Sequence, residues 1–335
     1  MSLADGVEAD DHLPEEQRTA LRRAVRWQIF TICYTAVTIA SVAFVLGSSQ
    51  AMKTAWIEDM LSLLPQLSFL VALVFIRRKP TPKHPYGQHR AMSVGHLVGG
   101  VALLAVGASL AVESALGLIR AEHPSIGTVN LFGHTIWLGW LMVSVMAVVV
   151  VGPVFLYGPA KVKLAPVLHN KLLYADADMA KADWQTNAAS IVGVLGVGIG
   201  WWWLDGAAAV FISLGIIWDG VRNTRAAVAD LMDQRARTFD DTRRHPLADV
   251  IHAHLAELDW VAESGIRMRD EGQVFHVEVF VVPADGRITV DRAEALAGAV
   301  QELDWKIQDV VIAPCATLPE YLDRPGAEAA DAKRH

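Results

Sequence analysis

Four acidic residues lie inside stretches of the chain that are otherwise long and apolar. Glu58 and Asp59 fall in the second such stretch, and Asp176 and Asp183 fall in the fifth. An ionised carboxylate at the centre of a bilayer costs roughly 2.5–3.5 kcal/mol on insertion scales, so such residues face a bundle interior or a water-filled path. There they meet a cation or a proton. The sequence therefore predicts an ion site buried inside a membrane protein.

The spacing in the fifth stretch puts several donor groups on one side of a helix. Because a helix turns about 100° per residue, Asp176, Met179, Asp183 and Asn187 share one face. Oxygen ligands of this kind suit harder divalent cations such as Mn²⁺, Mg²⁺ or Fe²⁺. A thioether ligand at Met179 would favour softer ions, and a methionine that only packs in the core is the alternative interpretation.

In the second stretch, Glu58 and Ser62 share a helix face, and Asp59 lies about 100° from Glu58. Pro65 follows one turn later and can free a backbone carbonyl near the acids. Fixed salt bridges are the alternative reading of these acids, but the two nearby lysines are too few to pair with four carboxylates. Acids left unpaired inside a membrane bind a cation or carry protons, and both activities serve transport.

The composition is typical of a membrane protein. The chain has 335 residues, of which 53% are hydrophobic and 19% charged, whereas soluble domains average about 25% charged residues. Two cysteines provide neither a disulfide framework nor a thiolate metal motif. No nucleophile stands beside a base in a recognisable motif, which argues against an enzyme. The basic residues follow the membrane face rather than an aromatic-rich patch, which argues against nucleic-acid binding.

Six segments are long and apolar enough to cross about 30 Å of hydrocarbon as helices. We expect these spans at residues 27–47, 55–76, 94–119, 131–157, 172–203 and 206–227. Basic residues gather before the first span and in every second connection after it. The positive-inside rule therefore puts both termini in the cytoplasm.

The pattern changes after Asp233. Residues 240–322 alternate helical and strand-like patterns in the order αββαβ, which predicts a small α+β domain with its helices on one face of the sheet. We thus expect a cytoplasmic tail over residues 1–22, a six-helix membrane domain over 23–235, the α+β domain over 240–322 and a disordered tail over 323–335.

Four features together resemble the cation diffusion facilitator family over about residues 20 to 320. Residues 84–90 read His-Pro-Tyr-Gly-Gln-His-Arg, close to the family's His-Pro-Tyr/Phe-Gly-His-Gly-Arg/Lys. Residues 175–183 match the spacing of its Ala-Asp-Ala-Leu-His-x-x-Ser-Asp motif, and residues 231–233, Leu-Met-Asp, match its Leu-Leu-Asp. The αββαβ order is the fourth. The resemblance implies six transmembrane helices followed by a ferredoxin-like cytoplasmic domain.

The resemblance also implies a metal site with two residues from the second span and two from the fifth. The matching positions here are Glu58, Ser62, Met179 and Asp183, so serine and methionine stand where the family has two of its usual ligands. The neighbouring acids are within reach and can compensate, which gives this predicted metal set: Glu58, Asp59, Asp176, Met179 and Asp183. Without the imidazole ligand, we expect the site to favour Mn²⁺, Fe²⁺ or Co²⁺ over Zn²⁺, or to accept these ions alongside Zn²⁺.

Two further sites follow from the resemblance. His84 matches a loop metal ligand of the family, and His89 follows Gln88, which stands where the family has a second histidine, so His84 and His89 are the expected loop metal site. Arg90 and Asp233 match a charge interlock, a pair of opposite charges near the inner face of the membrane. In the cytoplasmic domain, the family's histidine positions fall on other residue types, so we expect this domain to dimerise rather than to sense metal.

The expected function is a homodimeric divalent metal cation efflux transporter of the cell (inner or plasma) membrane that exchanges metal for protons. Its metal is the transported substrate, and no cofactor is expected. The alternative is a non-transporting membrane metal sensor or scaffold on the same fold, because two of the usual ligands are substituted.

Overall fold

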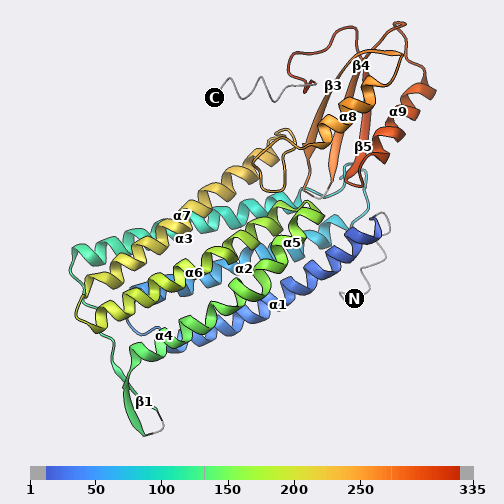
Figure 1. Ribbon diagram of the computed structural model, residues 1–335. Coiled ribbons are helices and arrows are strands. Elements are labelled where there is room, and N and C mark those ends of the chain that lie inside the picture. The colour runs from blue at the N-terminus through green and yellow to red at the C-terminus, as the bar shows by residue number, and fades with distance from the viewer. Residues whose placement is uncertain (1–12, 132, 273, 325–335) are drawn as a thin grey trace.

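The computed structural model describes residues 13–131, 133–272 and 274–324. A long helical bundle carries a two-stranded hairpin at one end and a small domain of helices and strands at the other (Figure 1). The start of α1 lies at the end that carries the small domain (Figure 1). The chain is therefore mostly helical, with a separate small sheet after the last long helix.

The bundle is made of long helices with the following bounds: α1 Glu15–Val45, α2 Gln50–Ile76, α3 Ala91–Ile119, α4 Leu138–Val149, η2 Gly152–Tyr157, α5 Gly158–Leu168, α6 Lys171–Gly198 and α7 Trp203–Leu231. Among the described residues, five helical stretches are long and apolar enough to cross a membrane: α1, α2, α3, the stretch from α4 to α5, and α7. The predicted fifth span, α6, has 28 residues but is not among them, because its charged and polar residues between Asp176 and Asn187 leave no stretch that is both long and apolar enough.

The fourth span differs from its prediction at both ends. Leu131 and residues 134–137, expected to lie at its start, belong instead to a hairpin in which β1 (Thr128–Leu131) pairs antiparallel with β2 (His134–Trp137). The helical stretch instead starts at Leu138 and continues to Leu168. The prediction ended the span too early because two lysines follow Tyr157, yet apolar residues resume after them and the helix continues. A predicted cytoplasmic connection is thus part of the bundle.

A π-helical turn, η2, interrupts the fourth span near its middle. Tyr34 of α1 fits against this turn: its hydroxyl donates to the carbonyl of Val149, 2.9 Å away, and accepts from the amide of Gly152 at 3.1 Å. A methyl group on Gly152 would lie 2.3 Å from the Tyr34 ring, so the close approach requires glycine.

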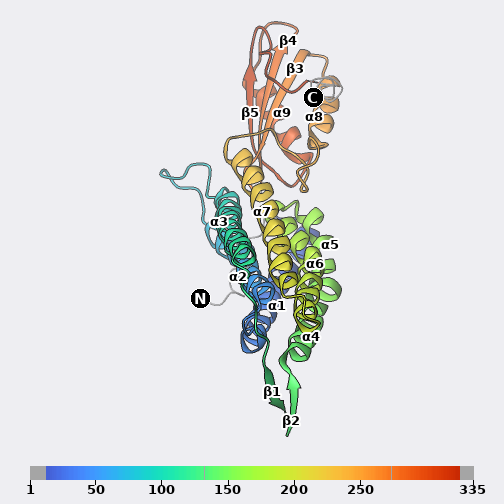
Figure 2. The same ribbon diagram turned by 90° about the vertical axis from the view of Figure 1, so that its left-hand side faces the viewer.

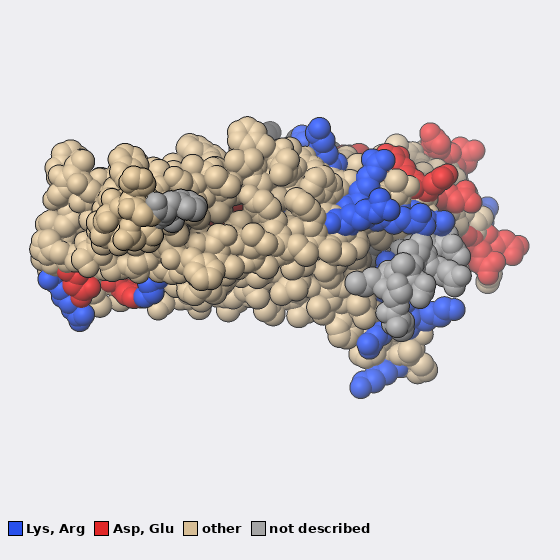
Figure 3. Space-filling view, turned by 90° about the horizontal axis from the view of Figure 1, so that it is seen from below, with Lys and Arg blue, Asp and Glu red and all other residues tan. Residues whose placement is uncertain are grey.

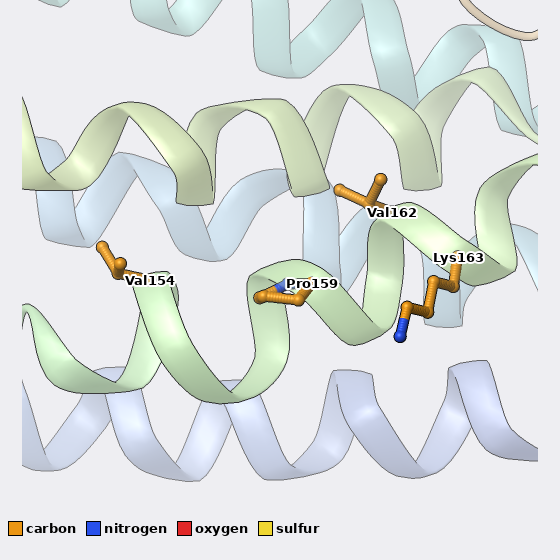
Figure 4. Close-up of a pocket in the computed structure, with 4 residues that line it drawn as sticks. All are labelled: Val154, Pro159, Val162 and Lys163. Carbon is orange, nitrogen blue, oxygen red and sulfur yellow. The ribbon is translucent and has the colours of Figure 1, made fainter.

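A groove of about 300 Å³ runs along the surface of the same span, over η2 and the start of α5. Its lining side chains are Val154, Pro159, Val162 and Lys163, which all come from η2 and α5 (Figure 4). Lys163 thus belongs to the outer side of the span.

Helices α3 and α7 lie side by side along most of their length (Figure 2). Glycines permit this approach: a methyl group on Gly100 would lie 2.7 Å from the Thr224 amide nitrogen, and one on Gly220 would lie 2.5 Å from that of Leu104. Close packing through small residues is the usual way in which helices associate inside a membrane. The other long helices pack α1 on α2 and α5, and α6 on α2, α5 and α7.

The small domain has the predicted αββαβ order: α8 Leu247–Ala256, β3 Val261–Asp270, β4 Phe275–Pro283, α9 Val290–Glu302 and β5 Ile307–Pro314. Strand β4 is central, antiparallel to β3 and parallel to β5. Alternate residues of β4 pack against Ile251 and Leu255 of α8 and Leu296 and Val300 of α9 in one apolar core.

The boundaries between the two predicted tails and the rest of the chain differ from expectation. Residues 15–22, assigned to the N-terminal tail, form the first turns of α1, where Ala20 and Leu21 are buried against Phe69. Asp323, assigned to the C-terminal tail, forms a bridge with Ile266 and an ion pair with Arg244 at 2.6 Å. The remaining tail residues, 1–12 and 325–335, lie outside the described part of the chain.

On the face seen in Figure 3, charged side chains gather toward the two ends of the molecule and leave a long middle zone of uncharged surface. Many large apolar side chains point outward from the helices, including Phe44, Val112, Phe155 and Trp218. Such a band of exposed apolar surface is typical of a protein whose middle lies in lipid.

Candidate ion site

Two capped helices hold the predicted acids. Helix α2, with Glu58 and Asp59, begins at Ser49, whose hydroxyl accepts from the Met52 amide at 3.1 Å. Helix α6, with Asp183, begins at Asn170, whose side chain accepts from the Leu173 amide at 2.8 Å. These N-caps follow from residue types that satisfy free amides at a helix start. Because α2 and α6 pack against each other, acids from distant parts of the sequence face one interior region.

The structure brings Glu58, Asp59 and Asp183 within electrostatic reach of one another. Thr186, one turn after Asp183, lies within hydrogen-bonding reach of Glu58. The Oε2 atom of Glu58 is buried and has no hydrogen-bond partner among the described residues. None of the three carboxylates has an ion-pair partner in the part of the chain that the structure describes. A buried carboxylate oxygen without a donor is costly and is the expected mark of a site that receives a cation or a proton.

These acids do not converge on one point. Within residues 13–131, 133–272 and 274–324, no group of three or more His, Cys, Asp or Glu side chains lies close enough together to hold a metal ion. Repulsion among like charges is consistent with this separation. The arrangement thus provides donors near one another rather than a closed coordination sphere.

Asp176 has partners that the sequence did not indicate. Its Oδ2 atom accepts from the Lys161 ammonium at 2.6 Å and from the Gln28 amide at 2.8 Å, and both Lys161 and Asp176 are almost fully buried. Lys161 was expected in a cytoplasmic connection, but it lies in α5 inside the bundle. The apolar residues that follow it, Leu164 to Leu168, are the sequence signal that the span continues past the lysine.

Met179 is buried in an apolar cluster with Leu61 of α2, Leu103 of α3 and Ile212 of α7. This placement favours packing rather than ligation. The Ser62 hydroxyl donates to the Asp59 carbonyl at 2.8 Å, and the Asn187 amide donates to the Asp183 carbonyl at 2.8 Å. Both polar side chains thus bond their own helix backbone.

Asp178, on the other side of α6, pairs with Arg222 of α7 at 2.5 Å. The pair joins two neighbouring helices.

The predicted loop histidines line one hollow of about 410 Å³ between the bundle and the small domain. His84 and His89 share it with Arg269 and Glu271 of β3 and the turn after it. Burial lowers the pKa of His89, and Glu271 opposes that shift. Two histidines and one glutamate border this hollow, but they do not lie close enough together to hold a metal ion.

Arg90 and Asp233 form an ion pair at the junction of α3 and α7. Arg90 also donates to the carbonyl of Leu231 at 3.1 Å, and so satisfies a free carbonyl at the end of α7. Arg269 of β3 lies 3.6 Å from the same aspartate. The interlock therefore includes a residue of the small domain.

A second and more deeply buried charge network joins the two parts of the chain at the start of α6. Lys171 lies 2.5 Å from Asp230 of α7, 3.4 Å from Asp241 and 4.0 Å from Asp270 of β3. Lys306, just before β5, lies 3.5 Å from Asp270. Sequence reasoning missed this network because each member alone resembles an ordinary interfacial charge.

Histidines border this network. The His169 ring packs 4.4 Å from that of His245, and both contact Phe275. Burial, with repulsion from Lys306, lowers the pKa of His169 and lowers that of His245 to about 4. Burial also lowers the pKa of Lys306 to about 8, against the attraction of Asp270. Both rings are therefore neutral at pH 7 and act as packing groups.

Comparison with known proteins supplies the decisive observation. The sequence profile described as the cation efflux transmembrane domain matches residues 27–232, which is more than half of the chain. The chain belongs to the cation diffusion facilitator family. A curated relative, the uncharacterized transporter YdbO of Bacillus subtilis (strain 168), is 21% identical over 293 residues, which cover 86% of this chain and 92% of the relative.

Membership of this family of metal cation efflux transporters carries several consequences. The protein is an integral membrane protein and a transporter rather than an enzyme. The metal cation is its transported substrate, and the family uses no cofactor. The matched region contains every acid of the candidate ion site.

Proposed function

We propose that this cation diffusion facilitator exports a divalent metal ion in exchange for protons, with Glu58, Asp59 and Asp183 as its ion site. The observation that carries the proposal is the buried Oε2 atom of Glu58, which has no hydrogen-bond partner among the described residues. Glu58 lies within electrostatic reach of both Asp59 and Asp183. In the proposal α6 also crosses the membrane, as the fifth of six spans along the chain, because it runs beside α2 and α7 within the bundle.

Asp176 and Met179 are not part of the proposed site. Lys161 and Gln28 already hold the Asp176 carboxylate, and Met179 packs among apolar side chains. The remaining ligands are oxygen atoms, which favour Mn²⁺, Fe²⁺ or Co²⁺ over Zn²⁺ or alongside it.

The three acids repel one another while the site is empty, and a divalent cation removes that repulsion. Ion binding therefore draws α2 and α6 together around the metal. Carboxylates ligate only when deprotonated, so protons that enter from the opposite side release the ion. Net exchange of metal for protons follows from this competition at one set of oxygens.

The proposed assembly is a homodimer in the cell membrane, with both termini in the cytoplasm. The small domain would provide the contact between two copies, since a core of this size gains stability from a partner. The basic residues at the ends of the cytoplasmic connections support the orientation.

Flux through reconstituted protein tests this proposal. Proteoliposomes would be loaded with a pH-sensitive dye and exposed to Mn²⁺, Fe²⁺, Co²⁺, Zn²⁺, Cd²⁺ and Mg²⁺ in turn, with and without a pH gradient. Saturable metal uptake coupled to proton movement is expected for at least one ion. Metal uptake that ignores the pH gradient would contradict antiport, and no uptake of any ion by folded dimeric protein would favour the sensor or scaffold.

A further inference from the structure

Lys161 is a cation built into the bundle beside the proposed ion site. It is fully buried in α5, its ammonium lies 2.6 Å from the Asp176 carboxylate, and it stands 5.1 Å from the centre of the Tyr157 ring. A buried ammonium is tolerated only where a carboxylate and polarisable neighbours replace its hydration. The sequence thus maintains a costly charge at this depth, which calls for a reason beyond packing.

The Lys161–Asp176 pair borders the acids of the proposed site. Lys161 lies within electrostatic reach of Asp183. Tyr157, whose ring Lys161 contacts, lies within reach of both Asp183 and Asp59. The ammonium therefore acts on the same region that would hold the transported ion.

The charge balance of this region depends on Lys161. When ionised, the carboxylates of Glu58, Asp59, Asp176 and Asp183 together with the Lys161 ammonium carry three net negative charges. Asp219 also lies within reach of Glu58, but Arg222 stands 3.4 Å from it and balances its charge. A bound divalent ion reduces the three net negative charges to one. Without the ammonium, a fourth negative charge would hold the ion more tightly, and the Asp176 oxygens would be free to ligate it.

Resting on the proposed function, we infer that Lys161 is a fixed counter-charge of the ion site. It keeps Asp176 from ligating the ion, and it weakens the attraction of Glu58, Asp59 and Asp183 for the ion enough to permit release. Lys161 does not touch the ion in this account; it is a positioning and specificity-determining residue that acts through charge.

Four variants separate charge from packing. Lys161→Gln removes the charge but keeps a donor for Asp176, and Lys161→Arg keeps the charge. Asp176→Asn removes the opposite charge, and the double variant Lys161→Met/Asp176→Asn restores the net charge of the wild type. Lys163→Gln is the matched control, because Lys163 lies two residues along α5 on the groove side of the span.

The measurement is the KM and kcat of Mn²⁺ uptake in proteoliposomes, with the melting temperature of each variant measured alongside. A unit charge at an effective dielectric constant of about 20 changes affinity by roughly tenfold or more. We expect Lys161→Gln to lower both KM and kcat roughly tenfold and Asp176→Asn to raise KM by a similar factor. Lys161→Arg, the double variant and Lys163→Gln should stay within about threefold of wild type.

Other outcomes overturn the inference. If the single variants only lower the melting temperature and leave KM unchanged, Lys161 is structural. If the double variant raises KM as much as Asp176→Asn does, Asp176 is a ligand and Lys161 does not withhold it. Because the double variant removes the buried pair together, it remains informative if a single variant fails to fold. Absence of Mn²⁺ uptake by the wild type, with uptake of no other divalent ion, would instead refute the proposed function.

Discussion

The Lys306 ammonium of the small domain donates a hydrogen bond to the backbone carbonyl of His169, 3.1 Å away. His169 ends α5 in a left-handed conformation, and Asn170 then caps α6. The small domain therefore contacts the short connection from which α6, the helix of Asp183, begins. Any movement of α6 during transport must move or break this contact.

Lys306→Met should destabilise the protein strongly. The substitution leaves Asp270 buried, with Lys171 as its remaining cation at 4.0 Å. Breaking one partner of a buried ion pair costs about 3–5 kcal/mol, which thermal unfolding of the purified protein would detect. The double variant Lys306→Met/Asp270→Asn should recover part of the loss, and the exposed Lys79→Met serves as control. Equal stability of Lys306→Met and the wild type would show that the contact carries no energy.

Gly272→Ala should loosen the small domain from the bundle. Gly272 has φ +100°, and a methyl group there would lie 2.9 Å from the Met92 side chain and 3.0 Å from the His89 carbonyl. Gly286→Ala is the matched control, because Gly286 has φ +69° and open space around it. Backbone strain of about 1–3 kcal/mol applies to both variants. Any difference between Gly272→Ala and Gly286→Ala in how firmly the small domain is held therefore reports the contact of Gly272 with Met92 and His89.

Limited trypsin digestion at the arginines of residues 235–243 reports this loosening. Faster cleavage in Gly272→Ala than in Gly286→Ala is the expected result. Equal cleavage rates in the two variants would mean that the turn does not hold the domain against α3.

Stability should fall as the pH drops from about 6.5 to 4. Burial lowers the pKa of His245 to about 4, and the pKa of His169 is lowered as well. In the unfolded chain these histidines take up a proton near pH 6.5, whereas the folded protein resists it. The contribution of these neutral histidines to the free energy of unfolding is therefore fully present above about pH 6.5, the histidine pKa in the unfolded chain. It is lost as the pH falls toward their lower pKa in the folded protein.

His245→Phe should make the melting temperature less dependent on pH in this window, because the ring that resists protonation is gone while packing on Phe275 is kept. His134→Phe, at an exposed position in the hairpin at the far end of the bundle, should leave the slope unchanged. Identical slopes for the wild type and His245→Phe would argue against the buried neutral histidine.

Asp205→Asn should weaken the start of α2 without altering metal affinity. Asp205 of α7 is buried and accepts from the Ser49 hydroxyl at 2.5 Å and the Gln50 amide at 2.6 Å. Hydrogen bonds to a charged group contribute about 1.5–3 kcal/mol, so the melting temperature should drop. The KM for Mn²⁺ should not change, since Asp205 contacts the start of α2, about two turns before Glu58. The exposed Asp285→Asn should have little effect, and a changed KM in Asp205→Asn would place it in the ion pathway.

Local pattern was sufficient to predict most of the helices and the αββαβ order. Alternation at Val277, Val279 and Val281 marks a strand buried on one face, and long apolar runs mark the spans. The hairpin over 128–137 was missed because its apolar residues continue directly into the helix that starts at Leu138. Hydropathy alone does not separate a short strand from the beginning of a span.

Long-range pairing was not predictable from the sequence. Nothing near Asp176 in the chain indicates that Lys161 and Gln28 will hold it, because its partners come from other helices. The same holds for Lys171 and Asp270, which meet only when the small domain docks on the bundle. Glu58, Asp59 and Asp183 were found from sequence because an unpaired acid in an apolar run is conspicuous without knowledge of its neighbours.

The most direct test of the account is Mn²⁺-dependent proton flux in proteoliposomes that contain wild-type protein or Asp183→Asn. Asp178→Asn is the matched control on the same helix, since Asp178 pairs with Arg222 outside the proposed site. Asp183→Asn should abolish flux while the protein remains folded, and Asp178→Asn should retain it. Normal flux in Asp183→Asn would contradict the proposed ion site.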